Sequence, residues 1–222
     1  HPPFRTDMTQ GATAPWPIER RQPAELPPAP VVVSVEDRSP RLAEELLQGL
    51  APAQPGLVLV FSSDAKLLIP LSQDLAKGLP EGCRIVGCSS AGEIGPGGYC
   101  AGTVTALGFP AASFRAEVCI LQRQEHIPVT EWMGQLRACR TSFAQNPDRA
   151  AFGILLADGT ARHEDVLVAT MDAAIPGIPV VGGSAADGLR FGRTCQGVDG
   201  TEYPGAAIFL LIETVFTIAE VT

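Results

Sequence analysis

Two glycine- and serine-rich segments constrain the fold of this chain most, because each directly follows a short apolar run. They are Gly87-Cys88-Ser89-Ser90-Ala91-Gly92-Glu93 and Gly182-Gly183-Ser184-Ala185-Ala186-Asp187-Gly188. An aspartate that closes an earlier apolar run, Asp64 or Asp158, precedes each segment by nearly the same number of residues. A glycine, Gly102 or Gly205, follows each segment and opens a strand-like stretch that reaches Ala-Glu-Val.

The agreement of these landmarks predicts an internal repeat. Each copy has the expected order β-α-β-β-β, and the two copies span about residues 57–118 and 152–221. We expect the glycine segments of two related copies to lie near each other or to line related sites. The helix expected at 130–143, between the copies, is left unmatched.

The two glycine segments are also the candidate ligand-binding site. Glycine permits positive φ and close approach to the backbone, while exposed N–H groups and serine hydroxyls supply hydrogen-bond partners. The candidate residues are Gly87, Cys88, Ser89, Ser90, Glu93, Gly182, Gly183, Ser184 and Asp187. In the alternative interpretation both segments are only tight bends whose serines bond to their own backbone.

These residue types favour a ligand that carries both charges. Glu93 and Asp187 can pair with an ammonium group, whereas the N–H groups and Ser89 or Ser184 can bind a carboxylate. The predicted ligand is therefore an amino acid or a similar zwitterion.

The sequence resembles a known family at these positions. Leu-Val-Phe-Ser at 59–62, Gly-Cys-Ser-Ser-Ala-Gly-Glu-Ile at 87–94 and Val-Val-Gly-Gly-Ser-Ala-Ala-Asp at 180–187 are similar to the N-terminal part of the FIST domain, over about residues 31–222. The chain departs from the family at Ala186, where a glycine is expected before the acid. Because the resemblance is to the N-terminal part alone, we expect the C-terminal half of the FIST module to be missing from this sequence.

The resemblance implies a sensory domain that binds a small ligand, with amino acids as the favoured class. It further implies a signalling partner, which would be a histidine kinase, a chemotaxis receptor or a cyclic-dinucleotide enzyme. One branch of the family consists of haem-binding nitric-oxide sensors.

Composition excludes some classes of partner. The chain has 222 residues, of which 45% are hydrophobic and 18% charged, so it can bury a substantial core. The formal net charge is −8, and Lys and Arg form no cluster in the sequence. Nucleic acids and anionic membrane surfaces are therefore not expected partners. The preference for Arg, Ala and Pro is typical of a GC-rich bacterial genome.

Residues 1–30 differ from the rest of the chain. They are rich in proline and have no sustained apolar period, which predicts a flexible leader before a domain at 31–222. The leader lacks the features of a secretion signal, and no later apolar stretch reaches the ~20 residues needed to cross a bilayer. We therefore expect a cytoplasmic location.

Helix and strand patterns alternate after the leader. The predicted helices are 39–50 (capped by Ser39), 67–79, 130–143 (capped by Thr130) and 163–174. The predicted strands are 31–35, 57–61, 84–88, 103–109, 114–121, 152–156, 180–181, 207–212 and 215–221, the last with an unpaired apolar edge. This order predicts an α/β (α+β) fold with helices flanking a mixed β-sheet, or two sheets face to face in an αββα sandwich.

The cysteines do not predict disulfides or a zinc site. The six cysteines have no framework spacing and form no CxxC pair, which indicates reduced thiols in the cytoplasm. Cys88, inside the first glycine segment, could have a lowered pKa, although a buried apolar role is the favoured interpretation. Asp158-Gly159-Thr160 could hold a cation or phosphate, but is better explained as the cap of the next helix.

Three classes of function remain open. The first is the ligand-sensing module, for which no cofactor is expected. The second is a haem protein with His126 or His163 as axial ligand. The third is a hydrolase or transferase with Cys88 or Ser89 as nucleophile, although no Walker loop, GxSxG elbow or dinucleotide fingerprint is present. Because no set of acid, base and nucleophile is evident, a sensor is favoured over an enzyme.

Overall fold

The structure is a computed structural model that describes residues 26–122, 127–143, 146, 148–160, 163–187 and 193–219. Most of the predicted leader, residues 1–25, lies outside this part of the chain. Residues 26–30 are exposed and adopt neither helix nor strand.

Two β-sheets form the centre of the molecule. The first contains, in spatial order, β1 (Val31–Glu36), β6 (Thr103–Pro110), β2 (Pro55–Ser62), β3 (Arg84–Ser89), β10 (Gln196–Val198) and β11 (Thr201–Glu202). The second contains β7 (Phe114–Leu121), β12 (Ala207–Thr214), β8 (Ala150–Asp158) and β9 (Val180–Ala185). Both sheets are mixed, because β2 is parallel to β3 and β8 to β9 while the other pairs are antiparallel.

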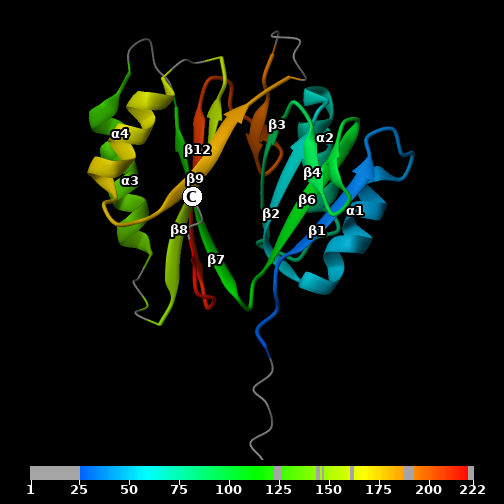
Figure 1. The fold of residues 1–222 in the computed structure, drawn as a ribbon. Helices are drawn as coiled ribbons and strands as arrows, with labels where there is room; N and C mark the ends of the chain where they lie inside the picture. The colour runs from blue at the N-terminus through cyan, green and yellow to red at the C-terminus, as the bar shows by residue number, and fades with distance from the viewer. Residues whose placement is uncertain are drawn as a thin grey trace, which may run out of the picture.

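Helices cover the outer face of each sheet (Figure 1). The helices of the first sheet are α1 (Leu42–Leu50), which continues into the short 3-10 helix at Ala51–Ala53, and α2 (Ala65–Ala76). The helices of the second sheet are α3 (Val129–Ser142) and α4 (Glu164–Ala174). The order of layers is therefore helix, sheet, sheet, helix, which confirms the predicted α/β class and, of the two arrangements, the αββα sandwich.

The central strands are apolar on both faces because both faces are buried. In β2, Leu57 and Leu59 contact the core between the sheets, together with Ile208 and Leu210 of β12. Their strand neighbours, such as Val58, point outward and pack with the leucines of α1 and α2. The alternation of side chains in β2 therefore joins two hydrophobic cores.

The two sheets share a topology. The order β1-α1-β2-α2-β3-β6 of the first unit (31–110) matches β7-α3-β8-α4-β9-β12 of the second (114–214), and equivalent strands have equivalent neighbours. These limits differ from the expected 57–118 and 152–221. In this topology α3, expected to be unmatched, corresponds to α1, and β7 begins the second unit instead of ending the first. An origin by duplication stays a prediction.

The short hairpins that precede β6 and β12 differ between the units. In the first unit, β4 (Glu93–Gly95) and β5 (Gly98–Cys100) form a separate two-stranded sheet. In the second unit, β10 and β11 cross over and extend the first sheet, because β10 pairs antiparallel with β3. The second unit thereby contributes two strands to the sheet of the first.

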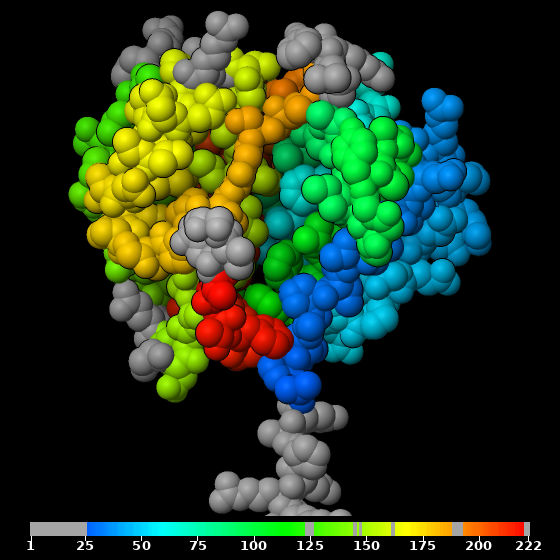
Figure 2. Space-filling view, in the orientation of Figure 1, coloured from blue at the N-terminus to red at the C-terminus, as the bar shows by residue number. Residues whose placement is uncertain are grey.

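Three sequence predictions are wrong in detail. Residues 215–219 form no strand and lie at the surface beside the start of the described chain (Figure 2). β12 ends at Thr214 between two paired neighbours, so the expected unpaired edge is not there. Residues 220–221 lie outside the described part. Ser39 does not cap α1, which begins at Leu42; its hydroxyl instead accepts from the Arg41 N–H. Thr130 lies inside the first turn of α3, because the Trp132 N–H already bonds to the Pro128 carbonyl.

Two adjacent glycines of β9 provide a test of the strand packing. A Cβ at Gly182 would collide with the backbone oxygen of Leu155, whereas one at Gly183 would have no heavy atom within 4 Å. Gly182→Ala should lower the free energy of unfolding by about 1–3 kcal/mol because β8 and β9 must separate. Gly183→Ala should change it by no more than about 0.5 kcal/mol. Urea denaturation measures both, and equal effects would contradict the close contact of β9 with β8.

Candidate ligand-binding site

The first glycine segment begins inside a strand, not in a turn. Gly87 lies in β3 between Val60 of β2 and Gly197 of β10. A Cβ there would lie 2.5 Å from the Val60 oxygen and 2.8 Å from Leu68 of α2. Gly87 is therefore needed for close packing, and the turn follows at residues 90–92.

The two proposed nucleophiles are buried. Cys88 is 5% exposed in the core between the sheets, and burial, followed by the neighbouring Cys195, raises the pKa of its thiol to about 12. Ser89 has no exposed surface, and its hydroxyl accepts a hydrogen bond from the Cys195 N–H at 2.9 Å. Because neither group is accessible and the Cys88 pKa moves in the wrong direction, the nucleophile hypothesis is wrong for both residues.

Ser89 instead joins the two glycine segments. Its N–H donates to the Cys195 carbonyl at 2.7 Å, and its own carbonyl accepts from the Ala186 N–H at 2.9 Å. The carboxyl ends of β3 and β9, which belong to different sheets, are therefore held side by side. The two glycine segments therefore lie near each other, as expected from the sequence. They meet through backbone hydrogen bonds, and Ser89 does not line a cavity there.

Glu93 is used inside the protein. It is 3% exposed, and its two carboxylate oxygens accept from the Ser90 hydroxyl at 2.6 Å and the Thr103 hydroxyl at 2.9 Å. These bonds fasten the loop after β3 to the start of β6. Ser90 and Glu93 therefore satisfy each other instead of facing a ligand.

The second glycine segment is exposed on an edge strand. Gly182, Gly183 and Ser184 line a groove of about 480 Å³ between β9 and α4, and the Ser184 hydroxyl donates to Glu164 at 3.2 Å. Asp187 lies apart from them and accepts a hydrogen bond from the Arg193 N–H at 3.1 Å. The nine candidate residues are thus divided among a buried junction, this groove and the surroundings of Asp187.

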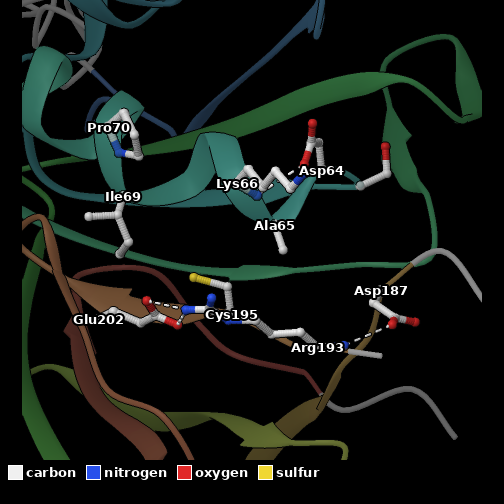
Figure 3. A pocket seen from close by; sticks show the side chains of 10 residues that line it. Asp64, Ala65, Lys66, Ile69, Pro70, Asp187, Arg193, Cys195 and Glu202 are labelled. Atoms are coloured by element: carbon white, nitrogen blue, oxygen red, sulfur yellow. Dashed lines mark hydrogen bonds and ion pairs between the residues drawn. The ribbon is translucent and has the colours of Figure 1, made fainter. Parts of the chain in front are cut away.

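Asp187 lines a cavity of about 500 Å³ at the carboxyl end of β2, which we call the interunit cavity (Figure 3). Ligands of open α/β sheets commonly bind at the carboxyl ends of strands. Residues of the first unit that line it are Ser63, Asp64, Ala65, Lys66, Ile69 and Pro70; those of the second are Asp187, Arg193, Cys195 and Glu202. The cavity therefore lies on the boundary between the two units.

The interunit cavity contains charges of both signs. The Arg193 guanidinium donates to both carboxylate oxygens of Glu202, at 2.7 and 2.8 Å. Asp64 caps α2 by accepting from the Lys66 N–H at 3.0 Å. Lys66 is exposed, and its ammonium group has no ion pair with any described residue. Burial, followed by the nearby Glu202, raises the pKa of the Cys195 thiol to about 11, so Cys195 contributes a neutral wall.

Asp158 anchors the chain next to this cavity. Burial alone would raise the pKa of its carboxyl, but hydrogen bonds from Thr160, Thr194 and Gly205 outweigh burial and lower the pKa. The Thr194 hydroxyl, 36 residues away in sequence, donates to the Asp158 carboxylate at 2.7 Å. Asp158 is not a helix cap as predicted, since α4 begins at Glu164 with His163 before it. It instead fixes the segment that carries Arg193 and Cys195.

Sequence reasoning missed Lys66, Arg193, Cys195 and Glu202. Asp64 and Lys66 directly follow an apolar strand and begin a helix. This position could have indicated a ligand site, because ligands of α/β sheets commonly bind at the carboxyl ends of strands. Arg193 and Glu202 had no such signal, since nothing in the sequence shows that β10 and β11 cross to the other sheet.

The structure gives little support to haem at His163. The cavity beside His163 has a volume of about 10 Å³, which is too small for a porphyrin and barely holds one water. His126 lies outside the described residues. No group of three or more His, Cys, Asp or Glu residues suited to a metal ion occurs within the described ranges. In that same part of the chain, no helix is long and apolar enough to span a membrane.

Thiol labelling tests the burial of Cys88. Cys100 is exposed, whereas Cys88, Cys139 and Cys195 are buried. With N-ethylmaleimide at neutral pH, the native protein should label rapidly at Cys100 and not at Cys88, and Cys100→Ser should remove the fast phase. All six cysteines should react in denaturant. Rapid labelling of Cys88 in the folded protein, located by mass spectrometry, would contradict the buried position.

The raised thiol pKa values also predict alkaline destabilisation. Burial raises the pKa of the Cys88 thiol in the folded protein from the ordinary 9.0 to about 12. The contribution of the neutral thiol to the free energy of unfolding is therefore complete below pH 9 and is lost as the pH rises toward 12. Between pH 8 and 10 the free energy of unfolding of the native protein should fall by about 1 kcal/mol more than that of Cys88→Ala. Equal losses in urea titrations would show that Cys88 does not contribute.

Comparison with known proteins identifies the family. The sequence pattern of the FIST N domain matches residues 56–221, which include every helix and strand from β2 to β12 except the first residue of β2. β1 and α1 precede the match but belong to the same sandwich. No protein of curated function matches the chain. The chain therefore belongs to the FIST N domain family, a family of sensory domains.

Proposed function

We propose that this chain is a sensory domain that binds a small zwitterion, such as an amino acid, in the interunit cavity. The observation that carries the proposal is a cavity with both signs of charge whose walls come from both units. Its volume of about 500 Å³ lies in the usual range for small-molecule sites.

The chemistry of the walls matches the two ends of an amino acid. The exposed Lys66 ammonium, near the amino end of α2, is suited to a carboxylate. Asp64 and Asp187 are suited to the ligand ammonium, since each has a carboxylate at the cavity wall. Ala65, Ile69 and Pro70 form the apolar part of the wall, where an aliphatic side chain can pack.

A ligand in this position is suited to signalling. Because it would contact α2 of the first unit and Asp187, Arg193 and Glu202 of the second, its binding energy would favour one arrangement of the unit boundary over others. A signalling partner would bind to one arrangement of this boundary in preference to others. The family resemblance implies that this partner is a histidine kinase, a chemotaxis receptor or a cyclic-dinucleotide enzyme. The six free thiols agree with the reducing cytoplasm in which such partners act.

Lys66→Met is the decisive variant, because it removes the charge and keeps most of the side-chain stem. If Lys66 binds the ligand carboxylate, the variant should weaken amino-acid binding by about 1.5–3 kcal/mol, which is roughly 10–100-fold. Isothermal titration of the native chain against the common amino acids identifies the ligand, and titration of the variant measures the loss.

Lys77→Met is the matched control. Lys77 follows the same helix and pairs with Asp74 at the surface, away from the cavity lining. It should leave amino-acid affinity unchanged. The proposal fails if no amino acid binds, or if both lysine variants bind it as tightly as the native chain.

A further inference from the structure

A second cavity of about 500 Å³ lies near the amino end of β2, whereas the interunit cavity lies at the carboxyl end. Its lining includes Arg84 of the first unit and Arg115, Arg149 and Glu213 of the second, together with apolar residues of both. We call it the arginine cavity. Its charged residues are three arginines and one glutamate.

This concentration of positive charge is unusual for the chain, whose formal net charge is −8. The Arg84 Nε donates to Asp199 at 2.8 Å, which fixes one guanidinium and compensates its charge. The Arg115 guanidinium lies over the Phe143 ring, 4.7 Å from its centroid, and Nη2 donates to the Ser142 carbonyl at 3.5 Å. Both groups are held in place while N–H donors remain for another partner.

Arg149 adds a third guanidinium. It is half-buried directly before β8, and its side chain has no hydrogen bond or ion pair with the rest of the described chain. Asp199 compensates the charge of Arg84. Two positive charges, those of Arg115 and Arg149, therefore remain at the wall of the cavity.

Glu213 is the observation that indicates a ligand. It is 5% exposed, lines the cavity, and forms no hydrogen bond or ion pair with any described residue. It lies opposite Arg115 in the register of β12 and β7, so the two side chains share a face of the sheet. Because its carboxylate oxygens have no partner among the described residues and are not fully enclosed, they face the cavity, where a bound cation or N–H donor can reach them.

We infer that the arginine cavity binds a small molecule that carries a phosphate group beside an ammonium group. A phosphate dianion balances the two uncompensated arginines and offers three oxygens to their N–H groups, more than a carboxylate does. The ammonium group of the ligand supplies a positive charge and N–H donors to the Glu213 carboxylate. This inference does not depend on the zwitterion site in the interunit cavity.

Three probe molecules test the phosphate contact and the ammonium contact separately. Phosphoethanolamine carries both groups, inorganic phosphate only the anion, and ethanolamine only the cation. In isothermal titrations of the whole chain, phosphoethanolamine should bind at least about tenfold more tightly than either of the others. Equal affinity for all three, or no binding at millimolar concentration, overturns the inference.

Variants assign the contacts. Arg149→Gln should weaken phosphoethanolamine and phosphate alike, by about tenfold or more. Glu213→Gln should reduce phosphoethanolamine to the affinity of phosphate and leave phosphate no weaker. Arg137→Gln, which removes an exposed arginine of α3 outside the cavity, is the control for general charge effects.

If Glu213→Gln does not fold, two measurements still test the inference. They are the comparison of the three probes and the effect of Arg149→Gln. Weakening by Arg137→Gln as large as that by Arg149→Gln would mean nonspecific attraction and would overturn the inference. Lys66→Met should leave phosphoethanolamine affinity unchanged; a loss there would place the probe in the interunit cavity and also overturn it.

Discussion

The contact between the two sheets determines the rest of the structure. Leu57 and Leu59 of β2 and Ile208 and Leu210 of β12 are all at most 2% exposed, and they pack between layers that are each covered by helices. Because both central strands must be apolar on both faces, polar groups are left to strand ends, loops and edges. Both cavities occur there, at the two ends of β2.

The hydrogen bonds of Ser89 then decide how one unit meets the other. They tie β3 to Cys195 and Ala186, and so place the segment that carries Arg193 beside the amino end of α2. Asp158 secures the same segment from β8 through Thr194. Ser89 is thus important for the interunit cavity without touching its contents, and a serine that seemed suited to binding has a structural role.

The sequence predicted the layers better than the site. Long runs such as 57–61 and 207–212 were recognised because buried strands leave a strong apolar signal, and the four α-helices of the described residues were all predicted. The hairpins at 93–100 and 196–202 were missed because strands of two or three residues carry no period. Glycine was also ambiguous: at Gly87 and Gly182 it permits close contact between neighbouring strands, which leaves the same sequence signal as a turn.

The predicted ligand-binding residues differ from those that line the two cavities for a related reason. A pattern of Gly, Ser and acid shows which groups can form hydrogen bonds but not whether the protein already satisfies them, as it does for Glu93. The informative residues are those whose charged groups have no ion pair within the described part of the chain, Lys66 in one cavity and Glu213 in the other. Both cavities are lined by both units, so a ligand bound in either would contact both sides of the boundary between the two units and not the apolar core that holds them together.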